Sequence, residues 1–221
     1  MHTVRCLAAP SAAVEIVPDL VALAVRELDI AAPVGHSKTA TTAARKQQRL
    51  RAIAFLRGID ATAIEAFWLA GGSAWDHRHD KAAHTVYAGP RATKSIPATV
   101  KLAVANRDGW RCRYCELRVI APSVLKALFQ ALPGAVPRGD RSMDEHPIHK
   151  VFRATPDHVL PRAHGGSNDA ANLVTTCGGC NFNRGDCSFD ELRLEDPLRR
   201  DPIADDSWTG LVGSLGPRSP F

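Results

Sequence analysis

Apolar residues recur at helical spacing through the first part of the chain. Residues 15–30 (EIVPDLVALAVRELDI) place valine, leucine and alanine three and four positions apart, a spacing that puts them on one face of a helix. Residues 41–58 (TTAARKQQRLRAIAFLRG) are rich in strong helix formers and end in a glycine that suits a helix C-terminus. Residues 61–72 (ATAIEAFWLAGG) predict a third, shorter helix. We therefore predict a mostly helical region over residues 1–93.

Two further helices are predicted in the middle of the chain. Residues 95–115 (SIPATVKLAVANRDGWRCRYC) begin with a helix opened by Ser95 and Pro97, whose apolar side runs from Val100 to Trp110. Residues 121–134 (APSVLKALFQALPG) predict an amphipathic helix that ends at Pro133 and Gly134, and GAVPRGDRSMDEHPIHK after it reads as a loop. The helix over residues 121–134 and the loop after it belong to a helical insertion over about residues 120–150. Residues 201–221 contain several prolines and glycines and predict a flexible tail.

Charge is sorted along the chain. The net charge is +5. Residues 35–58 contain six basic residues and no acid, and residues 91–118 contain seven basic residues against two acids. Residues 186–206 instead carry eight acids and three arginines. This distribution favours a basic surface that faces a polyanion such as DNA. For the run within residues 35–58, a solvated helix face is an equally good interpretation.

The N-terminal sequence argues against secretion. Glu15, Pro18 and Asp19 interrupt the first apolar stretch before it reaches the length of a signal peptide. No later segment is long and apolar enough to span a membrane. We therefore expect a cytoplasmic protein without a membrane partner, in which thiols stay reduced.

Two cysteine pairs have the two-residue spacing of zinc ligands. Cys112 and Cys115 form the first pair, and Cys177 and Cys180 form the second. Four thiolates complete one tetrahedral zinc site, and each pair presents two ligands from one turn. The alternative is two disulfides in a secreted protein, which the N-terminal sequence disfavours. We therefore predict a structural zinc site.

Several other potential ligands remain. Cys187, which like Cys6 falls outside the two pairs, is expected to be a small packed residue. The segment WDHRHDKAAH contains His77, His79 and His84. These histidines suit either a metal cluster or a polar loop, and the loop is favoured because no cysteine or close acid pair completes a ligand pattern.

Residues 157–185 read DHVLPRAHGGSNDAANLVTTCGGCNFNRG and combine an Asp-His pair, a Gly-Gly turn, an Asn before a short apolar strand, and a CxxC followed by Asn. From Lys94 to Leu192 the chain resembles the HNH endonuclease superfamily. The resemblance implies an α+β fold in which residues 94–200 form a ββα-metal, treble-clef-like nuclease domain framed by the four cysteines. The Asp-His pair would end the first strand, and the last Asn would start the helix with its N-terminus toward a phosphate.

The resemblance also assigns roles to these residues. Hydrolysis of a phosphodiester needs a base to deprotonate water and a cation to neutralise developing charge. His158 would be the base. Asp157 and Asn181 would bind a catalytic Mg²⁺ or Mn²⁺ through oxygen. Asn172 would hold the loop and orient the base.

Further contacts and the function follow from the same resemblance. Arg184, in place of a frequent Lys, and Arg162 would contact the substrate, whereas His164 is expected at the surface. The sequence predicts a metal-dependent endonuclease whose partner is DNA, with RNA and the oligomeric state left open. The alternative is a zinc-framed nucleic-acid-binding protein without catalysis. The complete set of Asp157, His158, Asn172 and Asn181 favours the enzyme, because a binding module would need only the cysteines and basic residues.

Overall fold

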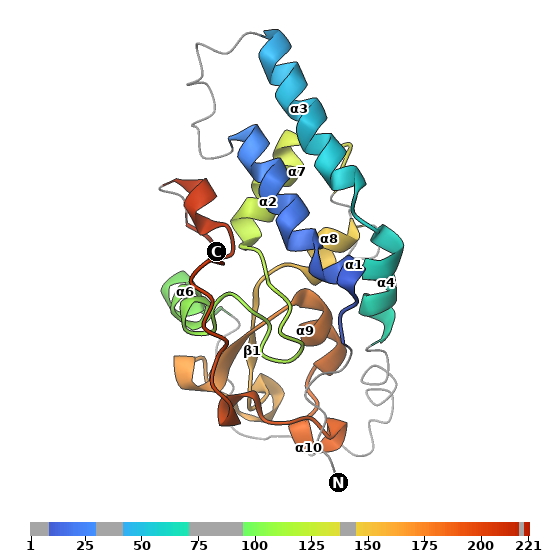
Figure 1. The fold of residues 1–221 in the computed structure, drawn as a ribbon. Helices are drawn as coiled ribbons and strands as arrows, with labels where there is room; N and C mark the ends of the chain where they lie inside the picture. Colours follow the sequence, from blue (N-terminus) through green and yellow to red (C-terminus); the bar gives the residue numbers. More distant parts are fainter. Residues whose placement is uncertain (1–8, 30–41, 71–94, 138–144, 217–218) are drawn as a thin grey trace.

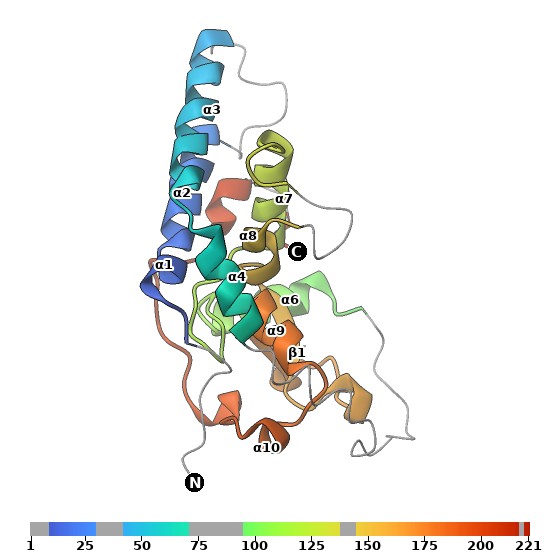
Figure 2. The ribbon, with the colours of Figure 1, turned by 90° about the vertical axis from the view of Figure 1, so that its right-hand side faces the viewer.

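The computed structural model describes residues 9–29, 42–70, 95–137, 145–216 and 219–221. It shows a helix-rich α+β protein whose described part contains one two-stranded sheet (Figures 1 and 2). This confirms the predicted mixed class. The segments that lie outside the described residues include those of Cys6, Lys38, His77, His79 and His84.

The N-terminal helices match the apolar periodicity. α1 (Ala12–Glu15) leads into α2 (Val17–Leu28), followed by α3 (Thr42–Arg57) and α4 (Ala61–Ala70). α2 and α3 lie side by side in both views, and Arg51 of α3 forms an ion pair of 2.8 Å with Glu27 of α2. The face of α2 that points inward carries residues three and four positions apart, namely Val17, Val21, Ala24 and Val25. Within the described ranges, none of the helices is long and apolar enough to cross a membrane.

The middle helices are α6 (Ala98–Arg107), α7 (Pro122–Ala131) and α8 (Pro147–Val151). α6 is shorter than predicted. Asp108 ends it and Gly109 follows with a φ of +62°, so Trp110 lies in the turn after the helix. The prediction of α7 is confirmed. α8 was missed, because five residues within an apparent loop are too short to show helical periodicity.

The hairpin consists of β1 (Thr155–His158) and β2 (Leu173–Thr176), which pair antiparallel with Thr155 opposite Thr176 and His158 opposite Leu173. β2 leads through Cys177 directly into α9 (Gly178–Arg184). The remaining short elements are η2 (Arg162–His164), η3 (Ala170–Asn172), α10 (Phe189–Leu192), η4 (Pro197–Arg199) and η5 (Val212–Leu215).

One apolar core joins the N-terminal helices to the hairpin and the cysteines. Val21 of α2, Phe67 of α4, Ile120 and Cys177 belong to the same buried cluster. The ring of Trp68 on α4 also stacks on Phe182 of α9, with centroids 4.8 Å apart. The boundary predicted at residue 93 therefore does not coincide with a break in the core. Burial of shared apolar area is the main force that fixes α4 against α9.

The prediction of a flexible tail does not hold for residues 201–216 and 219–221, which pack against the core through apolar side chains. Trp208 is buried and its Nε1 donates to the carbonyl of Val119 at 2.9 Å. Leu215 is fully buried, and the ring of Phe221 stacks on Trp110 with centroids 5.7 Å apart. The prolines and glycines of this segment separate widely spaced apolar anchors, so composition alone misjudged it.

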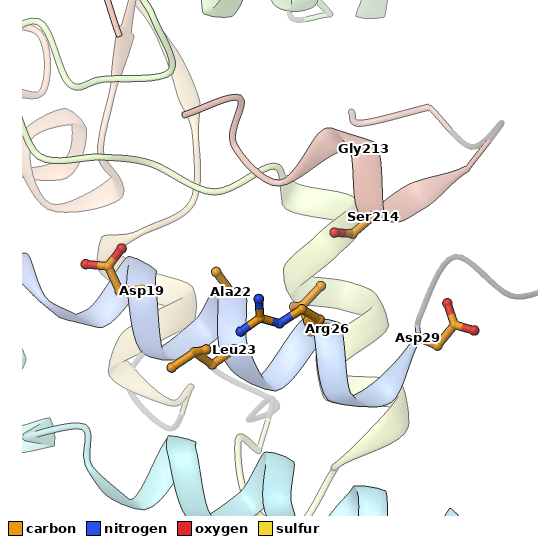
Figure 3. A pocket seen from close by; sticks show the side chains of 8 residues that line it. Asp19, Ala22, Leu23, Arg26, Asp29, Gly213 and Ser214 are labelled. Atoms are coloured by element: carbon orange, nitrogen blue, oxygen red, sulfur yellow. The ribbon is translucent and has the colours of Figure 1, made fainter. Parts of the chain in front are cut away.

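A surface groove lies between α2 and the η5 segment (Figure 3). Its lining includes Asp19, Arg26 and Asp29 from α2 and its C-terminal cap, together with Gly213 and Ser214. None of the residues predicted to carry chemistry lines this groove.

Candidate active site and metal centre

The four predicted zinc ligands come together. The Sγ atoms of Cys112, Cys115, Cys177 and Cys180 all lie within 4.8 Å of one another, and all four residues are buried. The Sγ atoms of Cys115 and Cys177 are 3.8 Å apart. This is far beyond a disulfide bond of about 2.05 Å. Zn–S bonds of about 2.3 Å in a tetrahedron would place sulfurs roughly 3.8 Å apart. The cluster is therefore compatible with structural zinc.

Hydrogen bonds among the thiols shift their pKa values in opposite directions. Burial opposes a charged sulfur, yet hydrogen bonds from the other three thiols lower the pKa of Cys112 well below its ordinary value. Hydrogen bonding to Cys112 raises the pKa of Cys115 and of Cys180 well above that value. Cys112 is thus the thiol that ionises more readily than Cys115 and Cys180. Zinc binds thiolates, so ionising all four sulfurs requires its charge. Cys187 is buried outside this cluster.

The turn that carries Cys112 and Cys115, the first cysteine turn, is hydrogen-bonded to β2. The residues that make these bonds were not identified from the sequence. The carboxylate of Asp108, 1% exposed, accepts from the backbone N–H of Thr175 at 2.6 Å. The N–H of Arg113 donates to the carbonyl of Thr175 at 2.8 Å. Arg107 donates to the carbonyl of Leu173 at 2.6 Å. These contacts set the distance between the cysteine pairs, and nothing in the sequence separates Asp108 from a solvated turn acid.

Asp157 and His158 are neighbours on β1, so their side chains point to opposite faces of the strand. Asp157 is 6% exposed and faces inward. Its Oδ2 accepts from the hydroxyl of Tyr114 at 2.6 Å and from the guanidinium of Arg184 at 2.8 Å. Burial and the charge of Asp157 raise the pKa of Tyr114 well above its ordinary value, which keeps the phenol protonated. His158 is half-buried on the other face.

Arg184 is not placed to contact a substrate phosphate. Its side chain is 0% exposed. Besides Asp157, it donates to the carbonyl of His158 at 2.6 Å and to that of Val159 at 2.8 Å. Burial would lower its pKa, but the charge of Asp157 and the hydrogen bond to it outweigh burial and raise the pKa. The prediction of phosphate contact is therefore corrected: Arg184 fastens α9 to the end of β1. The sequence pattern assigned a residue type to this position but not the direction of its side chain.

Asn181 lies on the same side of α9 as Arg184, because residues three apart occupy one helix face. Arg184 on that side is bonded to Asp157 of β1. Among the described residues, none donates to Oδ1 of Asp157. A carboxylate oxygen and an amide oxygen are ligands that Mg²⁺ and Mn²⁺ accept, so the residues fit such an ion.

The helix around Asn181 differs in one respect from expectation. Asn181 is the fourth residue of α9 rather than its first. The N-terminus of α9 is capped by the sulfur of Cys177, which accepts from the N–H of Cys180 at 3.3 Å. The start of the helix is therefore tied to the cysteine cluster through Cys177.

His158 is oriented by a residue that the sequence did not single out. Its Nε2 lies 2.9 Å from Oδ1 of Asn168, and the amide of Asn168 donates to the carbonyl of Ser95 at 3.3 Å. Because an amide oxygen only accepts, this contact assigns the ring proton to Nε2 and leaves Nδ1 as a proton acceptor. Asn168 sits in a Ser-Asn-Asp turn, where such a residue usually signals only the turn.

Asn172 closes the loop between the strands. Its Oδ1 accepts from the N–H of Leu160 at 2.8 Å, and its Nδ2 donates to the carbonyls of Leu160 and Ser167 at 3.2 and 2.9 Å. These three bonds span the whole connection. Asn172 thus supports the strand end that carries His158, while the ring itself is held by Asn168.

The Gly-Gly turn in this loop leads to a prediction. A Cβ at Gly166 would lie 1.8 Å from the carbonyl oxygen of Leu160 and 2.8 Å from Nδ2 of Asn172. Gly166→Ala should therefore break the Asn172 bonds and lower the free energy of unfolding by about 1 to 3 kcal/mol. Urea unfolding measures this, with Gly134→Ala as control because a Cβ there meets no atom within 4 Å. Equal stability of the two variants would contradict the loop geometry.

Arg162 and His164 are both half-buried in η2, within the loop that joins the two strands.

Comparison with known families finds that residues 149–193 match the family model of the HNH endonucleases. The match covers the hairpin, α9 and α10 and leaves the N-terminal helices and the first cysteine pair outside it. No curated protein and no solved structure showed significant similarity to the chain.

Proposed function

We propose that this chain, which matches the HNH endonuclease family model over residues 149–193, is a metal-dependent endonuclease that hydrolyses DNA phosphodiester bonds. The observation that carries the proposal is the hairpin followed by α9, with His158 at the end of β1 and Asp157 bonded to Arg184 of α9, three residues after Asn181. This arrangement supports a ββα-metal site framed by the cysteine cluster.

In this mechanism His158 is the general base. Its Nδ1 takes a proton from water, and the resulting hydroxide attacks the phosphorus. The bond to the leaving 3′ oxygen breaks, and that oxygen takes a proton from solvent, which yields 5′-phosphate and 3′-hydroxyl ends. Asn168 keeps the ring in the orientation that exposes Nδ1.

Asp157 and Asn181 would hold the catalytic ion. A bound Mg²⁺ or Mn²⁺ supplies the positive charge that stabilises the phosphate oxygens and the leaving group. Two protein oxygens leave most of an octahedral shell to water and phosphate, which suits these ions better than a second zinc. Arg162, in η2 of the strand-connecting loop, is proposed as the phosphate contact.

The proposal is tested by incubating the protein with supercoiled plasmid. We expect nicked or linear DNA when Mg²⁺ or Mn²⁺ is present and none when EDTA replaces the ion. The new ends should be ligatable without prior treatment, because they carry 5′-phosphate and 3′-hydroxyl groups. Cleavage that continues in EDTA would contradict the metal-dependent mechanism.

A second candidate is a zinc-framed nucleic-acid-binding protein without catalysis. One observation favours it: the carboxylate of Asp157 is already paired with the buried guanidinium of Arg184, which reduces the negative charge offered to an ion. The two candidates share the cysteine cluster and the basic segments. They differ in whether DNA that is bound is also cut.

The exposed basic residues of α3 give a further prediction. Arg45, Lys46 and Arg49 are exposed near the start of α3, at the end of the molecule opposite α10 (Figure 1). Reversing all three to Glu should weaken DNA binding and reduce the log-log salt slope by about 0.9 for each phosphate that the protein no longer neutralises. The measurement is a binding titration at several salt concentrations.

The control for α3 is Lys126→Glu. Lys126 is an exposed basic residue on α7, outside the basic segment of residues 35–58. It changes the net charge without touching α3. If the triple reversal leaves both the affinity and its salt dependence unchanged, the basic side of α3 is a solvated helix face.

A further inference from the structure

Tyr114 belongs to the first cysteine turn, and its side chain reaches β1. It lies between Cys112 and Cys115 in the sequence, is 1% exposed, and its hydroxyl donates to Oδ2 of Asp157 at 2.6 Å. Its ring packs edge-on against Phe189, with centroids 6.0 Å apart. The turn that supplies two cysteines of the cluster therefore also touches the carboxylate proposed to bind the catalytic ion.

The two donors to this carboxylate converge on one oxygen. Tyr114 and Arg184 both bond to Oδ2, from the cysteine turn and from α9 respectively. Two donors from different elements fix the plane of the carboxylate, and the described residues leave Oδ1 without a donor. The phenol orients the group without neutralising it, whereas the guanidinium also cancels its charge. Without the phenol, the carboxylate would turn further toward Arg184.

We propose that Tyr114 is a positioning residue that presents Oδ1 of Asp157 to the divalent ion, so that the cysteine turn sets the affinity of the catalytic site. This proposal rests on the proposed function, because it takes Asp157 as an ion ligand. It assigns to the cysteine cluster a role beyond holding the fold together. Partners that orient a metal ligand typically change metal affinity or activity by about 10- to 100-fold when they are removed.

The test compares Mn²⁺ binding by full-length, zinc-loaded wild type and Tyr114→Phe, followed by electron paramagnetic resonance of free Mn²⁺. The substitution removes only the hydroxyl and keeps the ring that packs on Phe189. We expect the Kd for Mn²⁺ to rise by about 10- to 100-fold, while the zinc content stays at that of the wild type. Cleavage by Tyr114→Phe should recover toward the wild-type rate in excess Mn²⁺, because the base is untouched.

The matched control is Thr176→Val in β2. It also removes one buried hydroxyl, whose bond goes to the carbonyl of Thr155 at 2.9 Å rather than to Asp157. Its Kd for Mn²⁺ should equal that of the wild type. A rise in Kd shared by both variants would show a general loss of structure and overturn the positioning role.

A third variant, Asn181→Ala, separates failure of this proposal from failure of the proposed function. If Asn181→Ala weakens Mn²⁺ binding and Tyr114→Phe does not, the positioning role of Tyr114 is wrong and the ion site stands. If neither variant changes Mn²⁺ binding, the assignment of the ion site is itself wrong, and the role of Tyr114 falls with it.

Discussion

Replacement of Cys112 by serine should abolish zinc binding and unfold the part of the chain around the hairpin. Cys112 is 1% exposed and contributes one of four sulfurs that meet within 4.8 Å. Structural zinc binding is worth about 10 to 16 kcal/mol in zinc-finger peptides, against a total stability of about 5 to 15 kcal/mol for an ordinary domain. Without the metal, the hydrogen bonds among the thiols cannot replace that energy.

Elemental analysis and thermal unfolding measure this effect. The wild type should hold one tightly bound zinc per chain, and chelation should remove the cooperative unfolding transition. Cys187→Ser is the matched control, because Cys187 is equally buried but lies outside the cluster. Folded wild-type protein without zinc, or a Cys112→Ser protein with the zinc content and stability of the Cys187→Ser control, would refute the four-thiolate site.

Replacement of His158 by alanine should remove cleavage and spare the fold. His158 is half-buried, and its ring is hydrogen-bonded to the side chain of Asn168. The substitution leaves the cysteines, Asp157 and Asn181 in place. General-base catalysis typically supplies about 10²- to 10⁴-fold in rate, so the single-turnover rate on a labelled duplex should fall by at least that range.

His164→Ala is the control for this loss, because His164 is also half-buried and lies in η2, in the loop that follows β1. Its cleavage rate should stay close to that of the wild type. Both rates are measured at saturating Mn²⁺ so that altered ion affinity does not enter the comparison. Cleavage by His158→Ala at the rate of His164→Ala would show that His158 is not the base.

The features that the sequence predicted correctly are local ones. The spacing of Cys112, Cys115, Cys177 and Cys180 fixes which atoms can meet, because two residues between cysteines form one turn. The end of β1 at His158 agrees with what the resemblance to the HNH superfamily implies. Helices such as α2 are predicted by the helical spacing of their apolar residues. The turn in each cysteine pair and the helix α2 are therefore indicated by residues close in sequence.

The features that the sequence did not show depend on distant partners. The sequence gives Arg184 the appearance of a surface arginine. Once α9 packs against β1, the two terminal nitrogens of Arg184 bond to Asp157 and to two backbone carbonyls. Asp108 and Tyr114 acquire their roles from Thr175 and Asp157, which lie 67 and 43 residues away. A single chain offers no local pattern for such pairs.

The central claim is tested most directly by measuring binding and cleavage of one duplex in the same samples. Wild-type protein should bind the duplex and cut it only when Mg²⁺ or Mn²⁺ is added. His158→Ala should bind with the wild-type affinity and leave the duplex intact at saturating Mn²⁺. Wild-type protein that binds the duplex but does not cut it with any divalent ion would contradict the account and identify a nucleic-acid-binding protein without catalysis.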